Sequence, residues 1–291
     1  MRWQGQRESE NVEDRRGSGV PRRGIALGGG GILLVVVLAL VTGQDPLQLL
    51  NAVSGPSVSV DTGSGEQDSA PSQVGAPSDE LGKFAATVLG STEDVWARVL
   101  PSSGHQYERP TLVLFTGAVQ SACGFSSAAV GPFYCPLDSK VYLDLLFFNE
   151  LEQRFAAPGD FAQAYVIAHE VGHHVQNLVG IATKVDEARR RLSPEDANAL
   201  SVRLELQADC LAGVWAYHAN QDAKLLEPGD VEEGLTAAGA IGDDRIQKRA
   251  QGYTVPESWT HGSSAMRVRW LRQGLQSGNV RDCDTFAAET L

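Results

Sequence analysis

The stretch Ala168-His-Glu-Val-Gly-His-His174 decides the fold of this chain, because it joins a metal-binding pattern to an apolar pattern of helical period. Apolar residues around it recur every three or four positions, which predicts an amphipathic helix from about Phe161 to Val179. Asp160 precedes this helix as a candidate cap, and Gly180 follows it as a natural stop. The motif is therefore expected on a helix and not in a loop.

His169, Glu170 and His173 form the pattern H-E-x-x-H. Histidines four residues apart project from one face of a helix, roughly 6 Å from each other, so that both imidazoles can bind one zinc ion. Glu170 is rotated by about 100° from His169, which lets its carboxylate reach a zinc-bound water without binding the metal. There it can take the water's proton and generate a nucleophile for a peptide carbonyl. His174 points away from the pair and is not expected to bind the metal.

A catalytic zinc ion takes three protein ligands and keeps one position open. A second helix is predicted from Ser193-Pro194 onward, and it carries Glu205 and Asp209 four residues apart on one face. We expect Glu205 to be the third ligand and Asp209 to accept a hydrogen bond from a zinc-bound histidine. The alternative is a solvated helix face on which the two acids pair with nearby cations. The metzincin pattern is excluded, since it needs a histidine where this chain has Val179.

The remaining elements predict an α+β fold. Two runs rich in β-branched and aromatic residues, Thr111–Thr116 and Lys140–Phe148, are predicted to be strands of one small sheet. After residue 160 the chain is expected to be mainly helical, with further helices near 230–251 and 263–276. Residues 79–291 have the length and composition of a single globular domain.

The first 78 residues differ in composition from this domain. Residues 1–23 carry six arginines and four acids, a net charge of +2. Because the whole chain has a net charge of −12, the remaining residues carry −14, and this negative charge argues against nucleic-acid binding. Residues 24–43 carry no charge and are long enough to cross a bilayer as one helix. The arginines before this helix predict that residues 1–23 form a cytoplasmic tail and that the domain lies outside the membrane. Residues 44–78 contain 15 Gly, Pro or Ser and are predicted to be a disordered linker. A cleaved signal peptide is the alternative to the membrane helix.

The chain has four cysteines, all within the predicted domain. Outside the cytoplasm, oxidation favours disulfides. Of the three connectivities we favour Cys123 with Cys135, which closes a loop before the second strand, and Cys210 with Cys283, which ties the end of the chain to the helix that carries Glu205. Free buried thiols are the alternative.

Several segments together closely resemble the bacterial putative neutral zinc metallopeptidase family, and the H-E-x-x-H and E-x-x-x-D pair looks like the gluzincin class of zinc peptidases. These segments are Ser121–Gly124, Gly131–Asp138, Val141–Asp144, Phe155–Phe161 and Ala168–Asn177. The resemblance implies a zincin fold, in which a small mixed sheet packs on the zinc-binding helix and its edge strand binds substrate in extended form. By that resemblance the edge strand is expected at 141–146. Within this strand, Val141, Leu143 and Leu145 are expected to contact the substrate.

A later segment, Thr260-His-Gly-Ser-Ser-Ala-Met-Arg267, is similar to a T-H-P-x-x-x-x-R stretch of a membrane-associated gluzincin family, with Gly262 where that family has proline. Gluzincins commonly place a late histidine or arginine beside the oxyanion. The resemblance therefore implies that His261 contacts the oxyanion or the substrate. The alternatives are a helix-cap role for His261, and pairing of Arg267 with Asp209 or another buried acid.

Together these features predict a single-pass membrane protein of the bacterial cytoplasmic membrane whose outer domain is a zinc-dependent peptidase. One Zn²⁺ per chain would activate water for direct hydrolysis of a protein or peptide substrate, with Glu170 as general base. Two alternatives remain open. One is a catalytically silent, zinc-stabilised binding protein of the envelope, and the other is an aminopeptidase, which would need an acidic anchor for the substrate's amino group.

Overall fold

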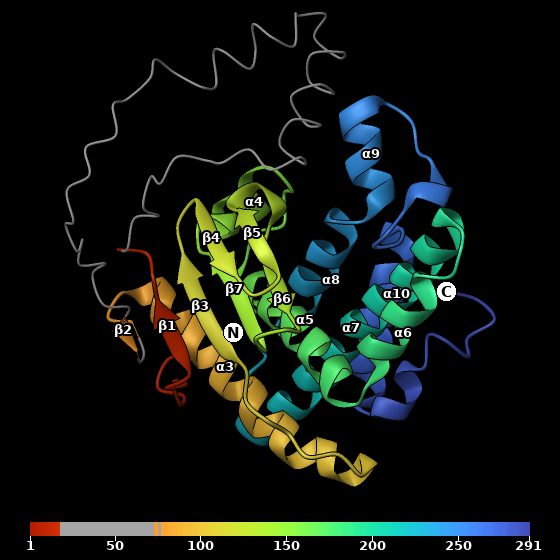
Figure 1. Cartoon of the computed structure of the whole chain (residues 1–291). Coiled ribbons are helices and arrows are strands. Elements are labelled where there is room, and N and C mark those ends of the chain that lie inside the picture. The colour runs from red at the N-terminus through yellow and green to blue at the C-terminus, as the bar shows by residue number, and fades with distance from the viewer. Residues whose placement is uncertain (18–72, 75–76) are drawn as a thin grey trace, which may run out of the picture. The chain divides into compact units, whose positions relative to one another are not determined.

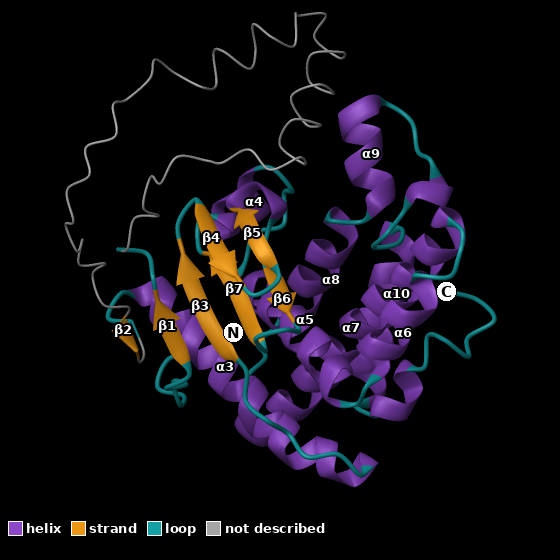
Figure 2. Ribbon diagram, in the orientation of Figure 1, coloured by secondary structure: helices purple, strands orange, loops and turns teal. Residues whose placement is uncertain are grey.

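The computed structural model describes residues 1–17, 73–74 and 77–291, in which a small mixed sheet lies beside a larger group of helices (Figures 1 and 2). The five-stranded sheet has the order β2-β1-β3-β7-β6. Its strands are β1 (Val12–Asp14), β2 (Gln73–Val74), β3 (Thr111–Phe115), β6 (Phe133–Cys135) and β7 (Lys140–Asp144). Strands β1, β3 and β7 are parallel, and β2 and β6 pair antiparallel at the two edges.

The second half of the chain is mainly helical, as predicted, and the fold class is α+β. The helices are α3 (Glu80–Val99), α4 (Phe147–Gln153), α5 (Asp160–Leu178), α6 (Ile181–Arg189), α7 (Pro194–Ala223), α8 (Asp230–Ala240), α9 (Asp243–Gln251) and α10 (Ser264–Ser277). Helix α5 contacts the sheet on one side and α7 and α8 on the other (Figure 2). The element that carries H-E-x-x-H is thus at the centre of the domain.

Both predicted strands are present, but the second is shorter than the run of apolar residues that predicted it. Strand β7 ends at Asp144 and not at Phe148. The carboxylate of Asp144 accepts hydrogen bonds from the backbone N–H groups of Gly117 and Leu146, which turns the chain out of the sheet. Residues 118–127 add a separate hairpin of β4 (Ala118–Ser121) and β5 (Gly124–Ser127).

The predicted limits of α5 and the predicted start of α7 agree closely with the structure. Ser193 caps α7 by accepting from the backbone N–H of Asp196, and Pro194 is the first helical residue. Gly180 follows α5 in a left-handed conformation with φ of 75°. Asp160, however, is the first residue of α5 and not its cap, and its carboxylate binds the amino group of Met1 at 2.7 Å.

Residues 1–17 are part of the domain and not a separate tail. Val12 is fully buried, and β1 lies between β2 and β3. The buried carboxylate of Glu93 on α3 accepts hydrogen bonds from three residues of this segment, Arg7, Ser9 and Asn11. Paired strands lie about 4.8 Å apart, so β1 and β3 cannot be separated by a membrane. This pairing corrects the expectation of a cytoplasmic tail opposite an external domain.

The predicted membrane helix at 24–43 and most of the predicted linker at 44–78 lie outside the described residues. Within the part of the linker that is described, Gln73–Val74 pairs with β1. In the described ranges, none of the helices combines the length and the apolar character needed to cross a bilayer.

Two disulfides join the cysteines in the favoured pairing. Cys123 bonds to Cys135 next to β6, and Cys210 of α7 bonds to Cys283 near the end of the chain. Disulfides persist in oxidising compartments, so their presence favours a location outside the cytoplasm.

We expect positions 10 and 289 to lie on the same side of the cytoplasmic membrane. Glu10 and Glu289 are exposed and the native cysteines are paired, so Glu10→Cys and Glu289→Cys each add one free thiol. A membrane-impermeant maleimide applied to spheroplasts should label both variants to the same extent, because β1 and the rest of the domain are one folded unit. Labelling of position 289 alone, with position 10 reactive only after lysis, would support the interpretation of residues 1–23 as a cytoplasmic tail.

Candidate metal centre

The site is built where α5 and α7 cross at close range. A Cβ atom on Gly172 would lie 3.0 Å from the backbone oxygen of Ala208, so a larger residue at position 172 would push the helices apart. His169 and His173 lie on the face of α5 that meets α7, and Glu205 lies less than one turn before Ala208. The glycine inside the H-E-x-x-H motif therefore sets the distance between the helix that carries His169 and His173 and the helix that carries Glu205.

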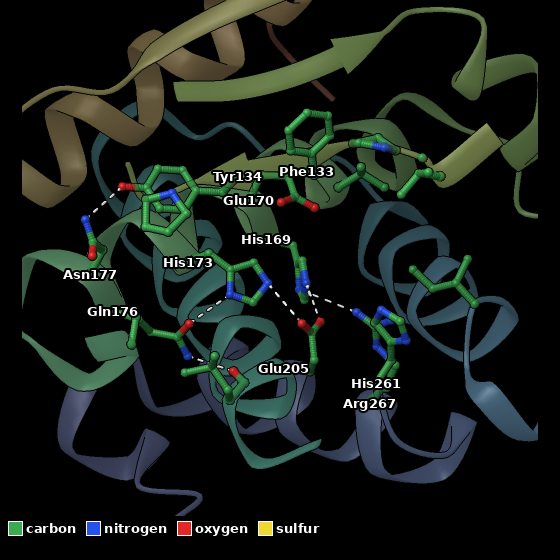
Figure 3. Close-up of a pocket in the computed structure, with 18 of the residues that line it drawn as sticks. Phe133, Tyr134, His169, Glu170, His173, Gln176, Asn177, Glu205, His261 and Arg267 are labelled. Carbon is green, nitrogen blue, oxygen red and sulfur yellow. Dashed lines mark hydrogen bonds and ion pairs between the residues drawn. The ribbon is translucent and has the colours of Figure 1, made fainter. Parts of the chain in front are cut away.

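Three side chains converge as the sequence predicted. His169 Nε2 lies 3.1 Å from Glu205 Oε2, and His173 Nε2 lies 3.4 Å from Glu205 Oε1 (Figure 3). One ligand atom from each of the three residues can be chosen so that all lie within 4.8 Å of one another. Ligands held about 2.1 Å from a tetrahedral zinc ion are roughly 3.4 Å apart, so the two distances from Glu205 suit this metal.

The electrostatics of the site favour a cation. Burial opposes the charge of Glu205, yet its interaction with His173 and its hydrogen bond to His169 hold the pKa of this carboxyl well below its usual value. Burial also opposes the charge of His169, but the neighbouring Asp209 raises the pKa of its imidazole to about 10. The position between these residues thus stabilises positive charge, which a divalent ion would supply.

Asp209 holds His169 in position, as expected. Its Oδ1 atom accepts hydrogen bonds from His169 Nδ1 at 2.8 Å and from the hydroxyl of Tyr165 at 2.6 Å. Its Oδ2 atom accepts from Arg267 Nε at 2.8 Å, and Arg267 is only 2% exposed. Burial opposes the charge of Asp209, but the Arg267 guanidinium and His169 keep the pKa of this carboxyl at about 2. Pairing of Arg267 with Asp209 was one of the two roles that the sequence left open for this arginine.

His173 has a neutral partner that the sequence analysis missed. Its Nδ1 atom lies 2.9 Å from Oε1 of Gln176, which is fully buried. The signal was present in the sequence, because a residue three positions after a helical histidine lies on the same face. Both imidazoles are therefore held through Nδ1, which leaves each Nε2 directed at Glu205.

His174 is buried and does not face the metal position. Its Nε2 atom donates to the backbone oxygen of Glu108 at 2.7 Å, and its Nδ1 atom accepts from the hydroxyl of Tyr134 at 3.0 Å. Burial lowers the pKa of His174, in keeping with a neutral ring that both donates and accepts. The Tyr134 oxygen also accepts from Asn177 at 3.1 Å, so α5 is fastened to β6 at two points.

Strand β6, and not β7, is the edge of the sheet beside the site. Strand β7 is paired on both sides, to β3 and to β6. The residues expected to face substrate are instead core residues, with Val141 and Leu143 each 1% exposed and Leu145 6% exposed. The expectation failed because the segment before β7 folds back antiparallel on it and takes the edge position.

A cavity of about 900 Å³ opens over the three convergent side chains. Phe133 and Tyr134 of β6 line it together with His169, His173 and Glu205 (Figure 3). Its further lining residues include Glu170, which is 8% exposed, and His261 and Arg267. Glu170 thus lies on the cavity without being one of the three convergent residues, as a general base requires.

His261 lies at the cavity wall near Arg267 (Figure 3). Its Nδ1 atom is 3.2 Å from Asp243 Oδ1, and Asp243 Oδ2 accepts the backbone N–H of His261 at 2.7 Å. The hydrogen bond to Asp243 raises the pKa of the His261 imidazole, whose side chain is 52% exposed. The alternative role as a helix cap is not observed, since Ser263 caps α10.

Comparison with known proteins agrees with this site. The family described as "Putative neutral zinc metallopeptidase" matches residues 1–286. The chain belongs to this family. It is 46% identical over 292 aligned residues to "Uncharacterized protein YpfJ" of Escherichia coli K12. This alignment covers 98% of this chain and 99% of the relative. It is 44% identical over 230 residues to "Uncharacterized protein Rv2575" of Mycobacterium tuberculosis H37Rv, covering 75% of each chain. No solved structure matches.

We expect Glu205→Ala to weaken zinc binding by more than about 100-fold, because it removes one of the three proposed ligands. Loss of a residue that only hydrogen-bonds to a ligand already weakens metal binding by about 10–100-fold. His218→Ala is the matched control, since His218 lies on the same helix and bonds to the backbone oxygen of Gly278. Elemental analysis after dialysis and competition with a chelator measure the difference. Equal zinc content in the two variants would remove Glu205 from the site.

Proposed function

We propose that this protein is a zinc-dependent endopeptidase of gluzincin type, with a zincin-like catalytic domain and one Zn²⁺ held by His169, His173 and Glu205. The observation that carries the proposal is the convergence of these side chains beneath a cavity that Glu170 also lines. When bound, zinc would polarise the scissile carbonyl and lower the pKa of a water molecule. The chain's own residues would then move protons and orient the substrate.

Glu170 is the proposed general base. It would take the proton of the attacking water and deliver it to the leaving amine, so that no covalent intermediate with the protein is needed. Glu170 follows His169 directly on α5, and the helix fixes its position relative to both histidines. A structural zinc site would take four protein ligands and would not need this acid, whereas the group found among the described residues has three members. The enzyme is therefore favoured over a silent binding protein.

Strand β6 is the proposed substrate-binding edge. An extended peptide can pair with the open side of an edge strand through main-chain hydrogen bonds. Val130 and Leu137 line the cavity just before and after β6, and they are 71% and 75% exposed. Apolar side chains at both ends of the strand favour a substrate that runs past the site in both directions, which supports an endopeptidase with a preference for apolar residues.

Glu170→Gln should keep zinc and lose peptide cleavage, because the amide has nearly the same shape but cannot accept the water's proton. We expect kcat to fall by about 10²–10⁴-fold, the usual contribution of general base catalysis. Digestion of a peptide library by the zinc-loaded protein measures the activity, and zinc content is checked in parallel. An active Glu170→Gln protein, free of contaminating protease, would refute the assigned base.

His261 is the proposed donor to the oxyanion. A charged imidazole in contact with Asp243 can hold a proton at its other nitrogen for the developing negative charge. The pKa of His261 is raised, so the charged form persists to higher pH and is lost as the pH rises through that value. Activity that depends on this donor should therefore decline on the alkaline side.

Asp243→Asn should move the alkaline limb of the kcat/KM profile to lower pH, because it removes the carboxylate that raises the pKa of His261. His261→Ala should lower kcat by about 10²–10³-fold, as loss of an oxyanion donor does elsewhere. Asp244→Asn is the control, since Asp244 bonds to Ser264 and not to His261. If the profile of Asp243→Asn matches that of the unmodified protein, His261 is not the titrating donor.

The two disulfides support a location outside the cytoplasmic membrane. We propose membrane attachment through residues 24–43, whose absence of charge suits the apolar interior of a bilayer. Any such attachment must leave residues 1–17 on the same side as the domain, because β1 pairs with β3. The substrate would then be a protein or peptide of the bacterial envelope or its surroundings.

A further inference from the structure

The two histidines of the metal centre are held by partners of different charge. His169 Nδ1 bonds to the carboxylate of Asp209, whereas His173 Nδ1 bonds to the neutral amide of Gln176. An ionised partner holds a histidine tightly by itself, because charge-assisted hydrogen bonds are roughly twice as strong as neutral ones. The orientation of His173 therefore depends more on whatever fixes the amide of Gln176.

Gln176 is fixed because all of its amide atoms have partners. Oε1 bonds to His173, and Nε2 donates to the backbone oxygen of Leu204 at 2.7 Å and to Oε1 of Gln207 at 3.1 Å. Turning the amide over would place its NH₂ group against the Nδ1–H of His173 and its oxygen against two other oxygens. Gln176 thus accepts from His173 and sets the tautomer that leaves Nε2 free for a metal.

Gln207 connects this amide to the end of the chain. Its Nε2 atom donates to the backbone oxygen of Cys283 at 3.0 Å, and both residues are buried. Cys283 is bonded to Cys210, which lies three residues after Gln207 on α7. A continuous series of contacts therefore leads from the disulfide to His173 by way of two glutamines.

We propose that Gln176 and Gln207 are positioning residues through which the Cys210–Cys283 disulfide strengthens metal binding by His173. The inference rests on the proposed zinc site. The disulfide joins positions 73 residues apart and bonds Cys283, the residue that supplies the backbone oxygen, covalently to α7, beside the hydrogen bonds between Thr285 and Arg203. Once the bridge is opened, Gln207 loses a fixed acceptor, and the amide that orients His173 keeps only the Leu204 oxygen as a fixed partner of its Nε2 atom. The protein would hold zinc most tightly in the oxidising compartment where the disulfide forms.

Gln207→Leu tests this relay, because leucine fills a similar volume and cannot donate to Cys283. We expect zinc to bind about 10–100-fold more weakly, measured on the full chain by competition with a chromophoric chelator. The visible spectrum of the Co²⁺-loaded protein should change as well, which reports the ligand geometry independently of catalysis. Gln221→Leu is the matched control, since Gln221 is exposed on the same helix.

A second comparison separates positioning from general stability. Replacing Cys210 and Cys283 together by serine should weaken zinc binding in the otherwise unmodified chain, but should have little further effect when Gln176 is already leucine, because both changes break one relay. An equal loss in both backgrounds would show that the disulfide acts through overall stability and would overturn the proposal.

The outcomes also separate this proposal from the one on which it rests. If the unmodified chain does not retain zinc, both fail. If it retains zinc and Gln207→Leu binds zinc equally well, the relay is refuted and the peptidase proposal stands. If the cysteine variant does not fold, the Gln207→Leu measurement decides alone.

Discussion

The close crossing of α5 and α7 is the constraint on which the metal centre depends. Gly172 lies against Ala208 where no side chain could be accommodated without displacement. The crossing brings Glu205 to the Nε2 atoms of both histidines and Asp209 to the Nδ1 atom of His169. A second crossing follows the same principle, since a Cβ atom on Gly274 of α10 would lie 1.9 Å from the backbone oxygen of Cys210. That contact places Arg267 beside Asp209.

The buried charged side chains of the site stabilise the fold only when all of them are present, because each one compensates the charge of another. An isolated carboxylate at the position of Asp209 would be strongly destabilised by loss of water. Here Arg267, Tyr165 and His169 together supply hydrogen bonds to both of its oxygens. Removing one partner from such a group leaves a charge without compensation, which commonly costs about 3–5 kcal/mol. Asp209, the acid that orients His169, is thus tied to the stability of the helical half.

The N-terminal strand changes how the whole chain is organised. Arginine-rich sequence ahead of an apolar stretch is typical of a cytoplasmic tail, yet Arg7 bonds to Glu93 and Asp94 of α3 and Arg16 bonds to Asp14 and Asp79. These arginines act as structural cations inside the domain. Charge counting could not distinguish the two roles, because the partners Glu93, Asp94 and Asp79 lie far away in the sequence. Strands β1 and β2, which flank the apolar segment in the sequence, therefore belong to the same sheet.

The sequence by itself determined the local features of this protein. The period of its apolar residues predicted α5 and α7, and the spacing of His169, Glu170 and His173 predicted two ligands and a base on one helix, because helical geometry is set by neighbours within a turn. Residue chemistry also predicted Glu205, Asp209 and both disulfides. Only the tertiary structure decided that β6 is the edge strand, that β1 belongs to the sheet and that Gln207 reaches Cys283. Each of these contacts joins residues that no periodic pattern relates, so packing alone selects them.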